Sequence, residues 1–150
     1  MRHPTSLVDD ASSCSGYGKI AWEDLQCEQK YSMMRASGQS RVANLLFMRA
    51  LTKRTKGVTV NAVDPGNTNT GIARELPAPI RLFTRFLKSP EKGARTSIYL
   101  ATSPDVADVT GEYFHGTKVI TQNPIALDDD NAQRLWRLTE QLTATSTTVQ

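Results

Sequence analysis

The sequence predicts a layered α/β domain built on a parallel sheet. A long helical pattern is followed at once by a β-branched strand, and a second helix with a clear start follows further on. The expected order is strand, long helix, strand, helix, helix, weak strand, helix. Such alternation is typical of parallel pairing with helices packed on the sheet. The strands are too few for a complete doubly wound sheet, so we expect part of one.

The first half of the chain supplies the strongest elements. A short strand is expected at residues 6–8, and residues 14–30 are expected to form a loop or short helical turns. Residues 32–56 are predicted to be helical because apolar side chains recur there at three- and four-residue spacings without a proline. Gly57 is expected to cap this helix, and residues 58–63 form a buried strand that stops at Asp64-Pro65-Gly66. The recurring apolar residues are Met33, Met34, Val42, Leu45, Leu46, Met48 and Leu51.

The second half is less regular. A loop is expected at 67–79 and a short helix at 80–87. Ser89 and Pro90 are typical N-cap and first-turn residues of a helix that runs to about residue 102. A short strand is expected at 111–114. A last helix at 131–142 would place Ala132, Leu135, Trp136 and Leu142 near one face. We expect one domain over residues 1–143 and a frayed tail at 144–150.

Composition excludes several classes of protein. Eighteen basic and fifteen acidic residues are interspersed, which indicates a solvated surface and no nucleic-acid partner. No apolar run approaches the roughly 18 residues of a membrane span, and no signal peptide is evident. Cys14 and Cys27 match no metal spacing and are expected to be thiols in a reducing cytoplasm. His3 and His115 likewise indicate no metal site.

Four landmarks in order resemble one family. Ala11-Ser12-Ser13 follows a strand, a loop spans 20–26, the long helix carries 31–47, and the strand 58–63 leads into 64–70. Together they resemble the short-chain dehydrogenase/reductase superfamily and its retinol-dehydrogenase-like branch, as do 88–97 and Leu135-Trp136. The resemblance covers nearly the whole chain. It implies a partial Rossmann-like doubly wound parallel sheet, the C-terminal half of the fold, without the first nucleotide-binding strands.

The resemblance also implies roles for three residues. The family's carbonyl-polarising Ser corresponds to Ser13, its proton-transferring Tyr to Ser37, and the Lys four residues on to Arg41. Residues four apart share a helix face, so both reach one cofactor. Ser37 departs from the pattern because an aliphatic hydroxyl is shorter and far less acidic than a phenol, whose pKa is about 10. Arg41 can still contact ribose hydroxyls, but it does not replace Lys at a tightly shaped site.

The cofactor implied by the resemblance is NAD or NADP. Its expected contacts are Arg41, Pro65, Gly66, Asn67, Thr68 and Thr70. The family binds pyrophosphate on a Gly-rich turn before a helix, and this sequence holds no such turn. Gly16-Tyr17-Gly18 lacks a third glycine and a helix to open, so we interpret it as loop flexibility. Tight dinucleotide binding is therefore not expected.

Two other tyrosines were weighed as proton donors. Tyr31 and Arg35 repeat the four-residue spacing six positions earlier, which displaces a side chain by about 9 Å and roughly 120° on a helix. Tyr17 lies on the loop after Ser13. Both tyrosines are interpreted as ordinary packing residues.

Three functional hypotheses follow. The first is a degenerate relative without redox activity of its own. The second is an oxidoreductase acting on a small alcohol/carbonyl substrate, as part of a longer chain or through Ser13 and Arg41. The third is a non-catalytic homodimerisation module that uses the apolar surface of the 32–56 helix. The sequence does not name a substrate.

Overall fold

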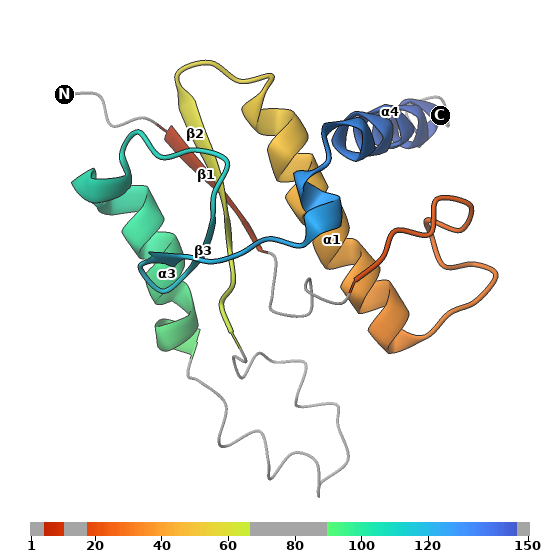
Figure 1. The fold of residues 1–150 in the computed structure, drawn as a ribbon, viewed down its shortest axis with the longest axis horizontal. Helices are drawn as coiled ribbons and strands as arrows, with labels where there is room; N and C mark the ends of the chain where they lie inside the picture. Colours follow the sequence, from red (N-terminus) through yellow and green to blue (C-terminus); the bar gives the residue numbers. More distant parts are fainter. Residues whose placement is uncertain (1–4, 11–17, 67–89, 147–150) are drawn as a thin grey trace, which may run out of the picture.

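The computed structural model describes residues 5–10, 18–66 and 90–146 (Figure 1). It confirms the α/β class. The elements are β1 (Thr5–Asp10), α1 (Met33–Thr52), β2 (Val58–Val63), α3 (Pro90–Thr102), the 3-10 turn η4 (Pro104–Val106), β3 (Tyr113–His115), β4 (Lys118–Val119), the 3-10 turn η5 (Pro124–Leu127) and α4 (Asp129–Ser146).

The sheet has the strand order β1-β2-β3-β4. β1 and β2 pair in parallel from Thr5↔Val58 to Asp10↔Val63, and β2 pairs in parallel with β3. The sequence did not predict β4, which forms an antiparallel hairpin with β3 through Gly116 at φ +63°. Figure 1 shows β1 and β2 between α1 and α3, so helices cover both faces of the parallel pair, as a parallel sheet requires.

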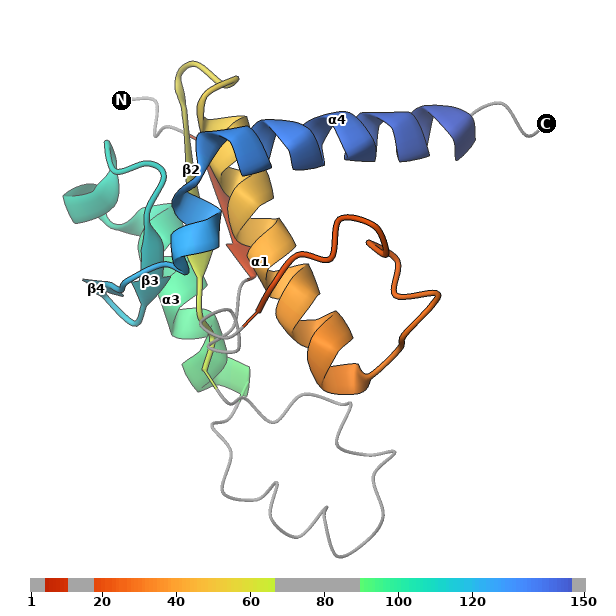
Figure 2. The ribbon, with the colours of Figure 1, turned by 45° about the vertical axis from the view of Figure 1, so that its right-hand side comes forward.

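Three apolar clusters hold these layers together. One lies between α1 and the sheet, the second joins α1 to α4, and the third joins α3 to the sheet. The first contains Leu45, Met48, Val60, Ala62, Tyr113 and Ala126; the second Val42, Leu46, Ala50, Ala132 and Leu135; the third Val63, Leu100, Val106 and Phe114. Figure 2 shows α4 lying across α1. The long helix is therefore buried on two sides, and Leu45, Leu46 and Met48 offer no surface to a partner.

The ends of α1 differ from the prediction. Ser32 is the N-cap, and its hydroxyl accepts a hydrogen bond from Arg35 N at 3.2 Å. The helix ends at Thr52, where Lys53 is the C-cap, although the pattern predicted residue 56 and a cap at Gly57. Just after the helix, the backbone N–H groups of Arg54 and Thr55 and the Thr55 hydroxyl all donate to Leu51 O, which satisfies that carbonyl without a glycine. Gly57, at φ +73°, belongs instead to the turn before β2.

The C-terminal elements also shift. The strand expected at 111–114 begins at Tyr113, because Gly111 adopts φ +81° in the turn before it. α4 starts at Asp129 and continues to Ser146, so residues 144–146 are helical where a frayed tail was expected. Leu142 is 46% exposed and lies outside the buried face predicted for this helix. α3 ends at residue 102 as predicted.

Other predictions lie outside the described residues. These are the loop at 67–79, the helix at 80–87, the Ser89 cap, and residues 147–150. Among the described helices, none is long and apolar enough to cross a membrane.

Candidate functional site

Ser37 and Arg41 lie one turn apart on α1, and their side chains touch. Arg41 Nε donates a hydrogen bond to Ser37 Oγ at 3.4 Å, and both side chains are half-buried. The predicted sharing of one helix face is thus confirmed. The contact places a permanent positive charge beside a hydroxyl that stays protonated at neutral pH.

A pocket of about 800 Å³ opens beside Ser37, between the segment 18–21 and the first turns of α1. We call it the Ser37 pocket. Its volume lies in the range of roughly 300–1,000 Å³ that small-molecule sites occupy. Its described lining consists of Gly18, Lys19, Ile20, Ala21, Met33, Met34, Arg35, Ser37 and Gly38. Arg41 is not among these residues.

The floor of this pocket depends on a close contact between two glycines. A Cβ placed on Gly18 would lie 2.2 Å from Gly38 O and 2.6 Å from Val42 Cγ2. Asn123 Nδ2 donates to Gly18 O at 3.1 Å and holds the segment in place. The interpretation of Gly18 as loop flexibility is therefore wrong: it is buried and permits close backbone approach. A glycine inside a helical pattern, Gly38, was the available sequence signal.

The loop after Gly18 is anchored to α1 by a buried glutamine that the sequence reasoning missed. Gln39 Oε1 accepts from Ala21 N at 2.8 Å, and its Nε2 donates to Leu25 O at 2.7 Å. Both the oxygen and the nitrogen of this amide are therefore hydrogen-bonded to backbone groups of the loop. Residues 20–27 are thus fixed against the helix that carries Ser37.

Asp24 fixes the remainder of the loop. Its carboxylate accepts from Gln29 N at 3.1 Å and Lys30 N at 3.3 Å, and it pairs with Arg35 at 3.4 Å. The hydrogen bond from the Gln29 backbone, followed by smaller contributions, lowers the pKa of Asp24 below its ordinary value of 3.8. The Arg35 guanidinium is therefore held by the loop, through its ion pair with Asp24 and its hydrogen bond to Lys30 O. Its four-residue partner Tyr31 is 75% exposed, so the interpretation of Tyr31 as a packing residue is wrong.

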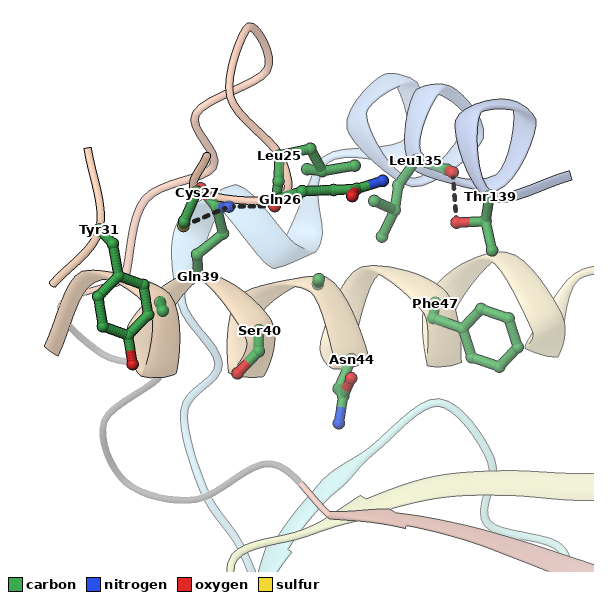
Figure 3. Close-up of a pocket in the computed structure, with 12 residues that line it drawn as sticks. Leu25, Gln26, Cys27, Tyr31, Gln39, Ser40, Asn44, Phe47, Leu135 and Thr139 are labelled. Carbon is green, nitrogen blue, oxygen red and sulfur yellow. Dashed lines mark hydrogen bonds between the residues drawn. The ribbon is translucent and has the colours of Figure 1, made fainter. Parts of the chain in front are cut away.

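A second pocket, of about 420 Å³, lies between the loop 25–31, α1 and α4 (Figure 3). Figure 3 shows Gln39 directed to the loop, with Ser40, Asn44 and Phe47 further along α1. Cys27 is a buried free thiol here and accepts from Gln39 Nε2 at 3.5 Å. Neither Ser37 nor Arg41 lines this pocket, so it is separate from the predicted site.

The Asp64-Pro65-Gly66 turn is preformed at the carboxyl end of β2. Buried Asp64 accepts from Gly66 N at 2.8 Å through Oδ1, and its Oδ2 lies 3.5 Å from His115 Nδ1 at the end of β3. Gly66 adopts φ +68°, which favours glycine. Ligands of open α/β sheets bind outside the carboxyl ends of the strands, where this turn lies.

The remaining predicted site residues are not all placed. Ser13, Asn67, Thr68 and Thr70 lie outside the described residues, as does Tyr17. Within the described part of the chain, no cluster of His, Cys, Asp and Glu could hold a metal ion.

No family model matches the chain. It is 40% identical over 146 residues to retinol dehydrogenase 14 of Mus musculus, covering 91% of this chain and 44% of that protein. The chain is 36% identical over 144 residues to retinol dehydrogenase 12 of Homo sapiens, a match that covers 93% of this chain and 46% of that protein. It is 35% identical over 125 residues to the chloroplastic short-chain dehydrogenase TIC 32 A of Brassica napus, a match that covers 78% of this chain and 39% of that protein.

A solved structure of an uncharacterized protein from Mycobacterium paratuberculosis matches with a TM-score of 0.70 and 25% identity. The match covers 94% of this chain and 51% of that one. Fold and relatives together define part of an α/β domain built on a parallel sheet. Over its matched length the chain is homologous to the retinol-dehydrogenase-like branch of the short-chain dehydrogenase/reductase superfamily. It spans less than half the length of the curated relatives it matches.

Proposed function

We propose that this protein descends from an NAD(P)-dependent oxidoreductase acting on an alcohol/carbonyl pair and has no redox activity on its own. The observation that supports this most is the contact of Arg41 with Ser37, at the positions where the family has Lys and Tyr. Proton transfer to a carbonyl needs a donor of suitable pKa within hydrogen-bond reach of the reacting atom. The Ser37 hydroxyl is too weak an acid and ends too close to the helix.

The described residues fit only one end of a dinucleotide. Arg41 offers guanidinium donors to a ribose, and the Pro65-Gly66 turn would border the nicotinamide, the group that accepts or supplies hydride when bound. For the pyrophosphate, this sequence has no Gly-rich turn at a helix N-terminus. We therefore propose that NAD or NADP binds weakly.

Titration of the purified chain against NADPH and NADH fluorescence tests this proposal. The expected result is no saturable change at micromolar cofactor, with full-length mouse retinol dehydrogenase 14 as the positive control. Saturable micromolar binding to the chain would overturn it.

An active enzyme within a longer chain is the alternative, because the relatives are more than twice as long. A chimera that joins the first half of retinol dehydrogenase 14 to this chain supplies the missing nucleotide turn. The proposal predicts no turnover of alcohols or carbonyls by this chimera, and turnover after the double substitution Ser37→Tyr and Arg41→Lys. Turnover by the unsubstituted chimera would favour the alternative.

A further inference from the structure

Asp64 and His115 meet where β2 and β3 end. Val63 pairs with Phe114 across the two strands, and the next residue along each strand contributes one side chain to the pair. Asp64 N donates a hydrogen bond to Phe114 O at 2.7 Å, which keeps the two strand ends together. Residues at the same level of adjacent strands project to the same face of the sheet. The approach of Asp64 Oδ2 to His115 Nδ1 at 3.5 Å therefore follows from the strand register.

The two oxygens of the Asp64 carboxylate have different partners. Oδ1 accepts from Gly66 N at 2.8 Å within the turn, and Oδ2 faces His115 Nδ1 on the β3–β4 hairpin. The Asp64 side chain is only 6% exposed. Burying a carboxylate is costly unless the charge is paired and hydrogen-bonded. The stability of the turn therefore depends on the charge that His115 carries.

The His115 ring is open to solvent on one side and closed on the other. Its side chain is 42% exposed, whereas its Nδ1 atom is shielded from water. A proton therefore exchanges with solvent through the exposed part of the ring, and the charge that it adds acts on a buried carboxylate. Histidine is the side chain whose ordinary pKa places this change of charge between about pH 5 and pH 8.

β2 and β4 each place a charged side chain beside His115. Asp64 comes from β2, and the exposed Lys118 of β4 is paired with His115 across the hairpin. From α3, the uncharged Thr96 contacts the hairpin and accepts from Gly116 N at 3.0 Å. Lys118 repels an imidazolium through solvent, where salt screens the repulsion, whereas Asp64 attracts it from a buried position. Asp64 is therefore the stronger of the two influences.

We propose that Asp64 and His115 form a pH-sensitive latch on the Asp64-Pro65-Gly66 turn. Protonated His115 pairs with Asp64 and holds its carboxylate in place, so the hydrogen bond from Gly66 N is kept. When His115 gives its proton to solvent, the buried carboxylate loses that counter-charge and the turn loosens. Because ligands of open α/β sheets bind outside the carboxyl ends of the strands, the latch makes that edge more ordered at acidic pH. It needs no dinucleotide, so it goes beyond the proposed function.

Hydrogen exchange of the Gly66 amide, measured by NMR on the chain without NADPH, tests the latch. The observed rate is divided by the intrinsic rate at each pH, which gives a protection factor. We expect the protection of Gly66 to fall several-fold between about pH 5 and about pH 8. The amide of Ala62, which donates to Glu112 O within the sheet, is the internal control and should keep its protection.

Substitutions at His115 reproduce the two states of the latch. His115→Lys stays positively charged up to about pH 8 and should keep Gly66 protected throughout. His115→Gln carries no charge and should give low protection throughout. Asp64→Asn retains an oxygen for Gly66 N but has no charge, so it should also remove the pH dependence. His3→Gln replaces the only other histidine and should behave like the parent chain.

Four results would each overturn the proposal. They are constant protection of Gly66 in the parent chain, a fall that persists in His115→Gln, a fall that is lost in His3→Gln, and an equal fall at Ala62, which would mean that the whole sheet opens. Circular dichroism establishes that each variant is folded at both pH values. If His115→Gln does not fold, Asp64→Asn provides the same comparison. Because NADPH is absent throughout, these outcomes are independent of the cofactor test.

Discussion

At the scale of single residues, Ser37 in place of the family's Tyr should impair turnover more than Arg41 in place of its Lys. Arg41 still places a positive charge beside position 37, and a nearby cation lowers the pKa of a phenol. Lys in place of Arg41, by contrast, adds no proton donor. In the chimera with retinol dehydrogenase 14, we therefore expect Ser37→Tyr alone to restore part of the turnover and Arg41→Lys alone to restore none. Steady-state rates with NADPH decide this, and equal recovery by both single variants would contradict it.

Gly18 is the residue whose replacement should harm the fold most. A methyl group there meets the Gly38 carbonyl at 2.2 Å, and that oxygen belongs to helix backbone that cannot turn aside. We expect Gly18→Ala to lower the free energy of unfolding by about 2–3 kcal/mol, as overpacking does. Gly57→Ala is the control: its Cβ meets open space, and the positive φ alone should cost about 1 kcal/mol. Urea denaturation measures both, and a smaller loss for Gly18→Ala than for Gly57→Ala would contradict the assigned contact.

These residues show where sequence reasoning reached its limit. The spacing of Ser37 and Arg41 predicted a shared helix face, because helical geometry is local. That spacing did not predict the role of Gly18, because a larger residue there is excluded by the carbonyl of Gly38, which lies much later in the sequence. Nor did it predict Gln39, whose amide is used up by a loop twelve to eighteen residues earlier in the sequence.

At the scale of elements, the core of each helix was predicted better than its ends. The apolar period of α1 identified the buried residues Val42, Leu45, Leu46 and Met48, although Met33 and Met34, which belong to the same period, are exposed. Just beyond the end of the helix, the Thr55 hydroxyl donates to Leu51 O. Such side-chain bonds leave the hydrophobic pattern unchanged. β4 was missed because a two-residue strand carries no period, and it forms only because β3 lies beside it.

The packing of α1 against α4 has an ionic component at Asp129. Its carboxylate lies 2.5 Å from Lys53 Nζ and 2.6 Å from Arg49 Nε. The hydrogen bond from Lys53, then that from Arg49, lowers the pKa of Asp129 below its ordinary value of 3.8. A lowered pKa in the folded state stabilises the protein above that ordinary value, and the stabilisation is lost as pH falls below it.

Asp129→Asn tests this ion pair through its pH dependence. The variant should melt at a lower temperature than the parent at pH 6, and the difference should shrink as the pH falls toward 2. Because the pair is exposed to solvent, it should also shrink at high salt. Asp130→Asn, in the same turn of α4, controls for the helix dipole. A difference in melting temperature that is constant from pH 6 to pH 2 would show that Asp129 acts by packing alone.

At the scale of the whole molecule, the parallel pair β1–β2 is covered by helices on both faces, yet β1 is the last strand of the sheet within the described residues. A strand in that position presents a row of backbone donors and acceptors that a further strand can pair with. The relatives and the matched solved structure are about twice as long, and larger domains bury a greater fraction of their surface.

The chimera with the first half of retinol dehydrogenase 14 should therefore be more stable than the chain alone. We expect a higher urea midpoint and a steeper denaturant dependence, since more surface becomes exposed on unfolding. The chain alone should associate as its concentration rises, and the chimera should remain at one size in light scattering. Leu7→Pro, in the middle of β1, removes a backbone donor from that strand and should cancel the rise in urea midpoint of the chimera. Thr117→Pro, in the β3–β4 turn, is the control for a proline elsewhere. Equal midpoints for the chain and the chimera would mean that β1 gains no partner strand, and that the two halves fold without a shared sheet.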